Sequence, residues 1–323
     1  MRVLVMGAGA VGGYYGAILA GRGHDVTLVA RGAHLRALQD RGLTVRDGDR
    51  SRGPLPVRAV GSPGDAPPGP ELVLFTVKGY DTEQAARALA PALGPATAVL
   101  TLQNGIDGVE RLAAVLGPAP VLAGTTVIEA TVPEPGLVVR LGLPPRIVLG
   151  EPDGPPSARA EAIAAAFRDA GVPAEVVPDI RRALWEKFVR LAPGATLTSA
   201  CQAPIGTVRD DPAGAALYRR LVEEAVAVGR AAGVDLGPHA ADQALGFIWS
   251  LPATMRTSMQ RDFERGGPVE LEPLTGAVVR EGRRRGVPTP AFDALYAVLR
   301  VRAAGRVAPP AGGAPAIQEG ATR

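Results

Sequence analysis

The sequence predicts an α/β protein of two domains, a doubly wound parallel sheet over residues 1–178 and an all-helical domain over residues 179–306. Three observations predict this fold. An apolar strand at the start of the chain runs into a glycine-rich turn and then a helix. Short strands then alternate with helical segments as far as residue 178, which is the pattern of a parallel sheet flanked by helices. After residue 179 the strand pattern disappears and long stretches of helical periodicity follow.

The elements of the first domain follow from its runs of apolar and β-branched residues. Buried strands are predicted at 2–6, 25–30, 72–77, 98–102 and 174–177. Extended segments are predicted at 43–46, 57–60, 121–132 and 137–149, and the Pro/Gly-rich segment 62–70 predicts a loop. Helices are predicted at 11–20, 33–41, 82–93, 106–116 and 158–170. Strands that alternate with helices in this way are expected to lie parallel.

The second domain is predicted from stretches of apolar residues at helical spacing. They cover residues 181–197, 215–232, 240–251, 273–285 and 291–303. With no strand pattern between them, these stretches predict a helix bundle. Residues 307–323 are rich in Ala, Gly and Pro and lack periodicity, which predicts a disordered tail.

Composition argues against several classes of protein. Charged residues make up 21% of the 323 residues and hydrophobic residues 46%, as in a soluble globular protein. The net charge of +3 comes without a basic run, so no nucleic-acid partner is expected. Residues 3–21 carry no charge, but they are too rich in glycine for a signal peptide or a membrane helix, so no membrane association is expected.

The cysteine and histidine content argues against disulfides and against a metal site. A single cysteine, Cys201, leaves no intrachain disulfide and favours a cytoplasmic location. The three histidines are far apart in the sequence and lack ligand spacing, so no metal site is expected.

The glycine-rich turn predicts a dinucleotide site. Residues 3–12 read V-L-V-M-G-A-G-A-V-G, a strand followed by the G-x-G-x-x-G spacing of a Rossmann-type nucleotide-binding domain. Gly7 permits the tight turn, Gly9 lets the backbone approach a pyrophosphate, and Gly12 lets the helix pack closely on the strand. The N–H groups at the helix N-terminus face the phosphates. The predicted cofactor-binding loop is therefore Gly7, Ala8, Gly9, Ala10, Val11 and Gly12.

The end of the second strand predicts which dinucleotide binds. Enzymes that use NAD usually place a carboxylate there to accept hydrogen bonds from the ribose hydroxyls. This chain has Arg31 instead, and its nearby Asp25 lies at the start of that strand. A guanidinium pairs well with a 2′-phosphate, which favours NADP(H). The alternative is that Arg31 caps the following helix or lies in solvent.

Lysine is rare in this chain. Only Lys78 and Lys187 occur among the 35 basic residues, and all the others are arginines. Arginine does not release its proton near neutral pH, whereas a buried lysine can be tuned to do so. Lys78 ends a strand, where ligands bind in doubly wound sheets, and Lys187 begins the helical domain. The placement suggests functional roles, with ordinary surface positions as the alternative.

These motifs occur together in one known family. The matching segments are G-A-G-A-V-G at 7–12, T-V-K-G at 76–79, Q-N-G at 103–105, A-G-T-T at 123–126, I-R-R-A-L-W-E-K-F at 180–188, S-M-Q-R-D at 258–262 and the region of Glu270. They extend over nearly the whole chain, which resembles the ketopantoate reductase (2-dehydropantoate 2-reductase) family. The resemblance implies a helical domain like the C-terminal domain of 6-phosphogluconate dehydrogenase. It also implies an NADP-dependent oxidoreductase of CH–OH groups that acts in pantothenate biosynthesis.

The resemblance implies roles for four residues around the substrate. Lys187 would be the general acid that protonates the carbonyl oxygen of a 2-oxo acid during hydride transfer. Glu270 would assist substrate binding and catalysis by holding Lys187 or a substrate hydroxyl, with a solvated loop acid as the alternative. Asn104 would lie beside the nicotinamide and the substrate, and Ser258 would bind a carboxylate.

The resemblance also implies contacts to the cofactor. Arg31 and Lys78 would contact its phosphates, and Asn104 and Ala130 would complete the set of cofactor-binding residues. The expected partner is a small-molecule substrate, a 2-oxo acid or a related carbonyl compound, and a homodimer is left open.

Three positions depart from the family pattern. Leu191, Ala195 and Thr275 stand where the family has asparagines, of which the first two face the substrate. Losing such polar contacts is expected to change the substrate, because buried polar groups discriminate strongly. The alternatives are a family member that reduces a different carbonyl compound, a catalytically weak NADP(H)-sensing protein, or a dehydrogenase of the 6-phosphogluconate or hydroxyacid type.

Overall fold

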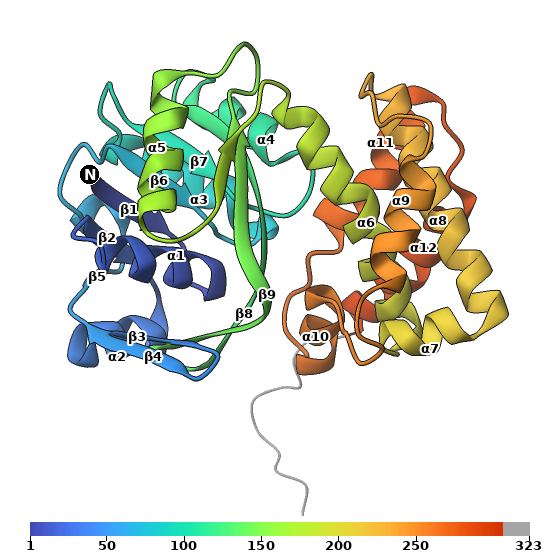
Figure 1. Ribbon diagram of the computed structural model, residues 1–323, viewed down its shortest axis with the longest axis horizontal. Helices are drawn as coiled ribbons and strands as arrows, with labels where there is room; N and C mark the ends of the chain where they lie inside the picture. The colour runs from blue at the N-terminus through green and yellow to red at the C-terminus, as the bar shows by residue number, and fades with distance from the viewer. Residues whose placement is uncertain (306–323) are drawn as a thin grey trace, which may run out of the picture.

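The computed structural model describes residues 1–305, which form two lobes (Figure 1). One lobe is a sheet covered by helices, and the other is a group of helices that starts with α6 (Ile180–Cys201). We propose a domain boundary near residue 178, between the last strand and this helix. The predicted tail at 307–323 lies outside the described residues. Within residues 1–305, no helix combines the length and the apolar character that a membrane span requires.

The sheet of the first lobe has ten strands. They are β1 (Arg2–Met6), β2 (Asp25–Val29), β3 (Leu43–Asp47), β4 (Arg50–Leu55), β5 (Arg58–Val60), β6 (Leu72–Phe75), β7 (Ala98–Thr101), β8 (Val121–Glu134), β9 (Leu137–Gly150) and β10 (Ala174–Val176). The order is β4-β3-β9-β8-β7-β6-β1-β2-β5, and β10 pairs with β9. From β8 to β5 every neighbouring pair is parallel, which confirms the doubly wound sheet.

Beyond β8 the sheet is no longer purely parallel. There β9 runs antiparallel to β8, because a tight turn at 135–136 joins the two strands and cannot carry a parallel crossover. Gly136 adopts φ +88° in this turn. A second antiparallel pair joins β3 to β4. The sequence R-S-R-G-P-L of β4 is largely exposed and lacks apolar alternation, so the pattern predicts no strand there.

Helices cover both faces of the sheet. They are α1 (Ala10–Ala20), α2 (Gly32–Arg41), α3 (Thr82–Leu89), α4 (Gly108–Leu116) and α5 (Ala158–Asp169), with short 3₁₀ turns at Pro63–Asp65, Gly79–Asp81 and Ala90–Ala92. Along β1 and β6, Val5 and Leu74 pack with α1 and α5, whereas Leu4 and Val73 pack with α3 and α4. Successive residues therefore enter two different cores, which is why these strands are continuously apolar.

The carboxyl ends of the central strands meet at one edge. Met6 of β1 pairs with Phe75 of β6, and Phe75 pairs with Thr101 of β7. Because the strands are parallel and end in register, the loops that follow them gather at the same edge, where doubly wound folds bind ligands. The glycine loop, Lys78 and Asn104 all belong to these loops.

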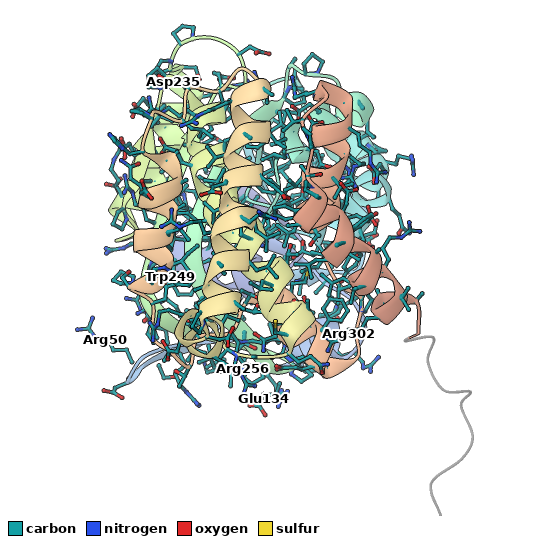
Figure 2. All side chains as sticks on the ribbon, turned by 90° about the vertical axis from the view of Figure 1, so that its right-hand side faces the viewer. Arg50, Glu134, Asp235, Trp249, Arg256 and Arg302 are labelled. Atoms are coloured by element: carbon teal, nitrogen blue, oxygen red, sulfur yellow. The ribbon has the colours of Figure 1, made fainter. Side chains whose placement is uncertain are left out.

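The second lobe packs around α6 (Figures 1 and 2). Its other helices are α7 (Ile205–Asp210), α8 (Pro212–Ala231), α9 (Ala240–Trp249), α10 (Ser258–Arg265), α11 (Ala277–Arg285) and α12 (Pro290–Ala304), and a π-helical turn covers Glu272–Gly276. Figure 2 views this lobe from outside and shows helices that lie side by side with side chains between them. The five predicted helical stretches are present, but the short α7 and α10 were not predicted, since one or two turns give little periodicity.

Candidate active site

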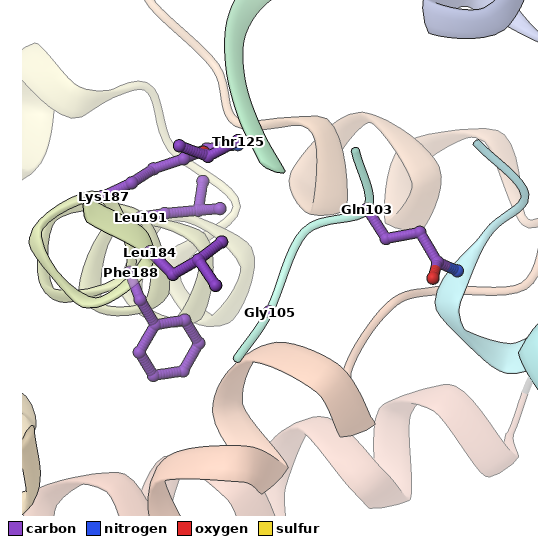
Figure 3. A pocket seen from close by; sticks show the side chains of 7 residues that line it. All are labelled: Gln103, Gly105, Thr125, Leu184, Lys187, Phe188 and Leu191. Carbon is purple, nitrogen blue, oxygen red and sulfur yellow. The ribbon is translucent and has the colours of Figure 1, made fainter. Parts of the chain in front are cut away.

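A pocket lies where α6 approaches the sheet edge (Figure 3). The residues that line it are Gln103, Gly105, Thr125, Leu184, Lys187, Phe188 and Leu191. Four of them share one face of α6 at helical spacing, and the others come from β8 and from the loop after β7. The pocket therefore combines the carboxyl edge of the sheet with a helix of the second lobe.

Lys187 is held by Asn104 in this pocket. Its Nζ donates a hydrogen bond to Asn104 Oδ1 at 3.0 Å, across 83 positions of the chain. Burial lowers the pKa of Lys187 to about 8, and the nearby Glu270 carboxylate offsets part of that shift. An amine with this pKa exchanges its proton readily near neutral pH, which suits a general acid.

We predict that the pH dependence of reduction follows this amine. In the predicted role the ammonium form donates the proton, so kcat/KM for reduction should be constant below about pH 8 and fall about tenfold per pH unit above it. The Glu270→Gln variant should move this alkaline limb to lower pH, because the carboxylate that raises the pKa loses its charge. Initial rates with a 2-oxo acid over a pH series measure both effects. A limb that stays in place or moves upward in the variant would contradict the assignment.

The glycine loop has the geometry of a phosphate-binding turn. Gly7 has φ +101°, which favours glycine, and a Cβ there would press on Val77. A Cβ on Gly12 would overlap the Gly7 carbonyl oxygen and the Thr76 hydroxyl, so the helix lies too close to the strand for any side chain. Gly9, by contrast, is exposed and a Cβ there would meet nothing within 4 Å. The backbone at Gly9 therefore offers an open approach to a phosphate at the N-terminus of α1.

Glu270 is buried and binds the first lobe. The residue is 4% exposed, which excludes a solvated loop acid. Its Oε1 accepts from the Gly79 N–H at 3.1 Å, and its Oε2 accepts from Lys78 Nζ at 3.1 Å. Asp262 of α10 accepts a second hydrogen bond from Lys78 Nζ, at 2.9 Å. Burial alone would lower the pKa of Lys78, but these two carboxylates outweigh it and hold the pKa well above its usual value.

This arrangement differs from one expected contact. The carboxylate oxygens of Glu270 accept hydrogen bonds from Lys78 and Gly79 and not from Lys187, and the other expected partner, a substrate hydroxyl, stays a prediction. Glu270 acts on Lys187 only through its charge. The contact of Lys78 with a cofactor phosphate stays a prediction, and here the ammonium joins the two lobes instead.

The remaining predicted site residues lie at separate places. Arg31 is exposed at the N-terminus of α2, and its side chain makes no capping hydrogen bond, which agrees with the alternative that it lies in solvent. Ser258 is the first residue of α10 and is exposed, and it does not belong to the pocket lining. Ala130 lies in β8 opposite Arg140 of β9. The binding roles of these three residues stay predictions.

Only one of the three departures from the family pattern lines the pocket. Leu191 does so, one helical turn after Lys187. Ala195 is buried in the core of the second lobe. Thr275 is fully buried, and its hydroxyl shares a hydrogen bond of 2.8 Å with Thr196. The pocket is therefore apolar at Leu191, while the other two positions serve the packing of the helices.

Three residues of this region were not predicted as site residues. Gln103 and Thr125 line the pocket, and Asp262 binds Lys78. Each one belongs to a segment that carried the family resemblance, Q-N-G, A-G-T-T or S-M-Q-R-D. Their presence in those segments is the signal that could have identified them.

Comparison with known proteins identifies the family. The family described as "Ketopantoate reductase PanE/ApbA" matches residues 3–154, and "Ketopantoate reductase PanE/ApbA C terminal" matches residues 179–303. The chain belongs to the ketopantoate reductase family. This confirms the resemblance and the prediction of an oxidoreductase that acts on CH–OH groups.

Several family members align over almost their whole length. The 2-dehydropantoate 2-reductase of Archaeoglobus fulgidus is 36% identical, and the alignment covers 93% of this chain and 97% of that protein. The 2-dehydropantoate 2-reductase of Mesorhizobium japonicum is 34% identical with the same coverage. The crystal structure of a PanE/ApbA family ketopantoate reductase from Ralstonia eutropha superposes with a TM-score of 0.87 at 34% identity, covering 95% of this chain and 99% of that one. The ketopantoate reductase fold is thus shared in both lobes.

Proposed function

We propose that this chain reduces the carbonyl group of a 2-oxo acid with NADPH as the hydride donor. The observation that supports this most directly is Lys187, whose amine lies in the pocket with a pKa of about 8 and is oriented by Asn104. A proton donor of this kind is what carbonyl reduction requires, because negative charge develops on the substrate oxygen.

The residues at the sheet edge fit a dinucleotide. The open backbone at Gly9 and the N–H groups of the first turn of α1 would hold the pyrophosphate, and Arg31 would bind the 2′-phosphate that distinguishes NADPH. When bound, NADPH supplies the hydride. Lys187 holds a proton at Nζ and donates it to the substrate oxygen, while Asn104 keeps that amine in position and Glu270 favours its charged form.

Two observations bear on the substrate. The relatives named 2-dehydropantoate 2-reductase support 2-dehydropantoate. The apolar lining at Leu184 and Leu191 supports a different 2-oxo acid with an apolar side chain, because neither residue can bind a substrate hydroxyl.

A panel of substrates tests the proposal. NADPH consumption would be followed with 2-dehydropantoate, 2-oxoisovalerate and phenylpyruvate, and repeated with NADH. We expect turnover of at least one 2-oxo acid and a preference for NADPH. A chain that binds NADPH tightly and reduces none of these compounds would support the sensing alternative instead.

We predict that Arg31 sets the cofactor preference. The Arg31→Ala variant should raise KM for NADPH by about 10- to 100-fold, the loss expected for a charge-assisted hydrogen bond, and leave KM for NADH almost unchanged. Arg22→Ala is the matched control, because Arg22 is also exposed but precedes the opposite end of β2. An equal rise in KM for NADPH and for NADH in Arg31→Ala would contradict binding of the 2′-phosphate by Arg31. The same would follow if Arg22→Ala raised KM for NADPH as much as Arg31→Ala does.

A further inference from the structure

A buried hydroxyl in the pocket has no internal partner. Thr125 is 7% exposed, and its Oγ1 is closed to solvent and makes no hydrogen bond within residues 1–305. Figure 3 shows its side chain beside that of Lys187, where β8 and α6 approach each other. Burying a hydroxyl without a partner is unfavourable, and a valine would fill the same space without that penalty. A threonine here therefore indicates a partner that arrives with a ligand.

The other polar side chains of the pocket are already engaged. Gln103 Nε2 donates to the Val77 carbonyl at 3.0 Å and to the Thr82 hydroxyl at 2.9 Å. Lys187 donates to Asn104. Among the pocket-lining side chains of the described chain, the Thr125 hydroxyl is thus the polar group left for a ligand oxygen.

The two oxygen-bearing groups of a 2-oxo acid fit the Lys187 amine and the Thr125 hydroxyl. Its carbonyl oxygen must lie within hydrogen-bond reach of Lys187 Nζ to receive the proton. Its carboxylate is bonded directly to the carbonyl carbon, so a carboxylate oxygen then lies within the same small pocket. The wall formed by Leu184, Phe188 and Leu191 offers no hydrogen bond, which leaves the β8 side for the carboxylate.

We propose that the Thr125 hydroxyl donates a hydrogen bond to a carboxylate oxygen of the substrate while Lys187 binds its carbonyl oxygen. Thr125 would then orient the 2-oxo acid for attack on one face of the carbonyl. This inference rests on the proposed reduction of a 2-oxo acid and adds a substrate-binding residue to that site.

The Thr125→Val variant tests the contact. With the best substrate of the panel, kcat/KM should fall about 10- to 100-fold, mainly through KM, as expected for a hydrogen bond to a charged group. The affinity for NADPH should stay unchanged. The melting temperature should be equal or higher, because the variant removes a buried polar group that lacks a partner in the free protein.

The next residue of the strand provides a matched control. Thr126 points to the opposite face of β8, where its hydroxyl is hydrogen-bonded to the Tyr15 hydroxyl and donates to the Arg146 carbonyl at 2.9 Å. The Thr126→Val variant should therefore lower the melting temperature and leave KM for the 2-oxo acid unchanged. Opposite responses of two adjacent threonines would separate substrate binding from a structural role.

A further measurement tests whether the substrate carboxylate is the group that accepts the hydrogen bond from Thr125. With the methyl ester of the same 2-oxo acid, the effect of Thr125→Val should shrink to less than about threefold, because the ester lacks the negative charge. An unchanged KM in Thr125→Val, or a weaker affinity for NADPH in place of the substrate effect, would overturn the inference.

If the wild type reduces no 2-oxo acid, the proposed function fails. Oxamate binding to the NADPH complex then tests Thr125 separately, with about 10- to 100-fold weaker binding expected in the variant and equal binding counting against it.

Discussion

Replacing Lys187 with alanine is expected to lower kcat for 2-oxo acid reduction by about 10²- to 10⁴-fold, the usual contribution of a positioned general acid. In the proposed role the amine donates the proton; its pKa lies near 8 because burial disfavours the charged form, and Asn104 accepts a hydrogen bond from it. The affinity for NADPH should stay within about threefold, since the proposed cofactor site is the glycine loop and not Lys187. Stopped-flow rates and NADPH titrations measure the two quantities on the same preparation.

The Lys187→Arg variant is the control for charge. A guanidinium keeps the positive charge that stabilises the developing oxyanion but does not release a proton near neutral pH. We expect its kcat to remain well below that of the wild type and its alkaline limb near pH 8 to disappear. An arginine variant with nearly wild-type turnover would show that charge alone suffices and would remove proton transfer from the role of Lys187.

The second large effect is a loss of stability when the glycine loop is altered at Gly12. The Gly12→Ala variant should lose about 3 kcal/mol of unfolding free energy, at the upper end for overpacking, because the new Cβ would overlap the Gly7 carbonyl oxygen and the Thr76 hydroxyl. The Gly7 oxygen is part of the backbone and the Thr76 hydroxyl is part of a short side chain, so neither atom can move aside easily. Urea unfolding measures the loss, and the affinity for NADPH should fall with it, since the loop would be displaced.

Gly9→Ala is the matched variant with the opposite expectation. Gly9 has φ −72°, and the space that a Cβ would occupy there is free, so the unfolding free energy should change by less than about 0.5 kcal/mol. The methyl group would instead occupy the approach of the pyrophosphate, and the dissociation constant for NADPH should rise about 10-fold or more. Unchanged affinity in Gly9→Ala, or unchanged stability in Gly12→Ala, would show that the loop serves a different purpose.

The structure explains why some site residues were predictable and others were not. Gly7, Gly9 and Gly12 were predictable because their spacing reflects local backbone geometry, and a strand must precede them and a helix follow. Lys187 stood out because lysine is rare in this chain. The A-G-T-T segment marks Thr125 and Thr126 alike, and only the pleat of β8 decides that Thr125 faces the pocket and Thr126 the core.

The partners of the charged residues also required the structure. Glu270 and Lys78 are separated by 192 positions, and no property of either segment indicates that they meet. The same limit applies to Leu191, Ala195 and Thr275, which the family pattern treats alike. The direction in which α6 and the π-helical turn present these side chains places Leu191 in the pocket and the other two in the packed interior.

The sequence alone determined the two-domain α/β plan, and it predicted the nucleotide-binding loop and Lys187 as the general acid. These follow from periodicity, from glycine spacing and from motifs, all of which are local in the chain. The tertiary structure alone decided that β9 turns back antiparallel to β8, that Glu270 binds Lys78 rather than Lys187, and that Thr125 faces the pocket without a partner. The physical reason is that each of these depends on side-chain direction and on contacts between segments far apart in the sequence, which only the packing of the two lobes brings together.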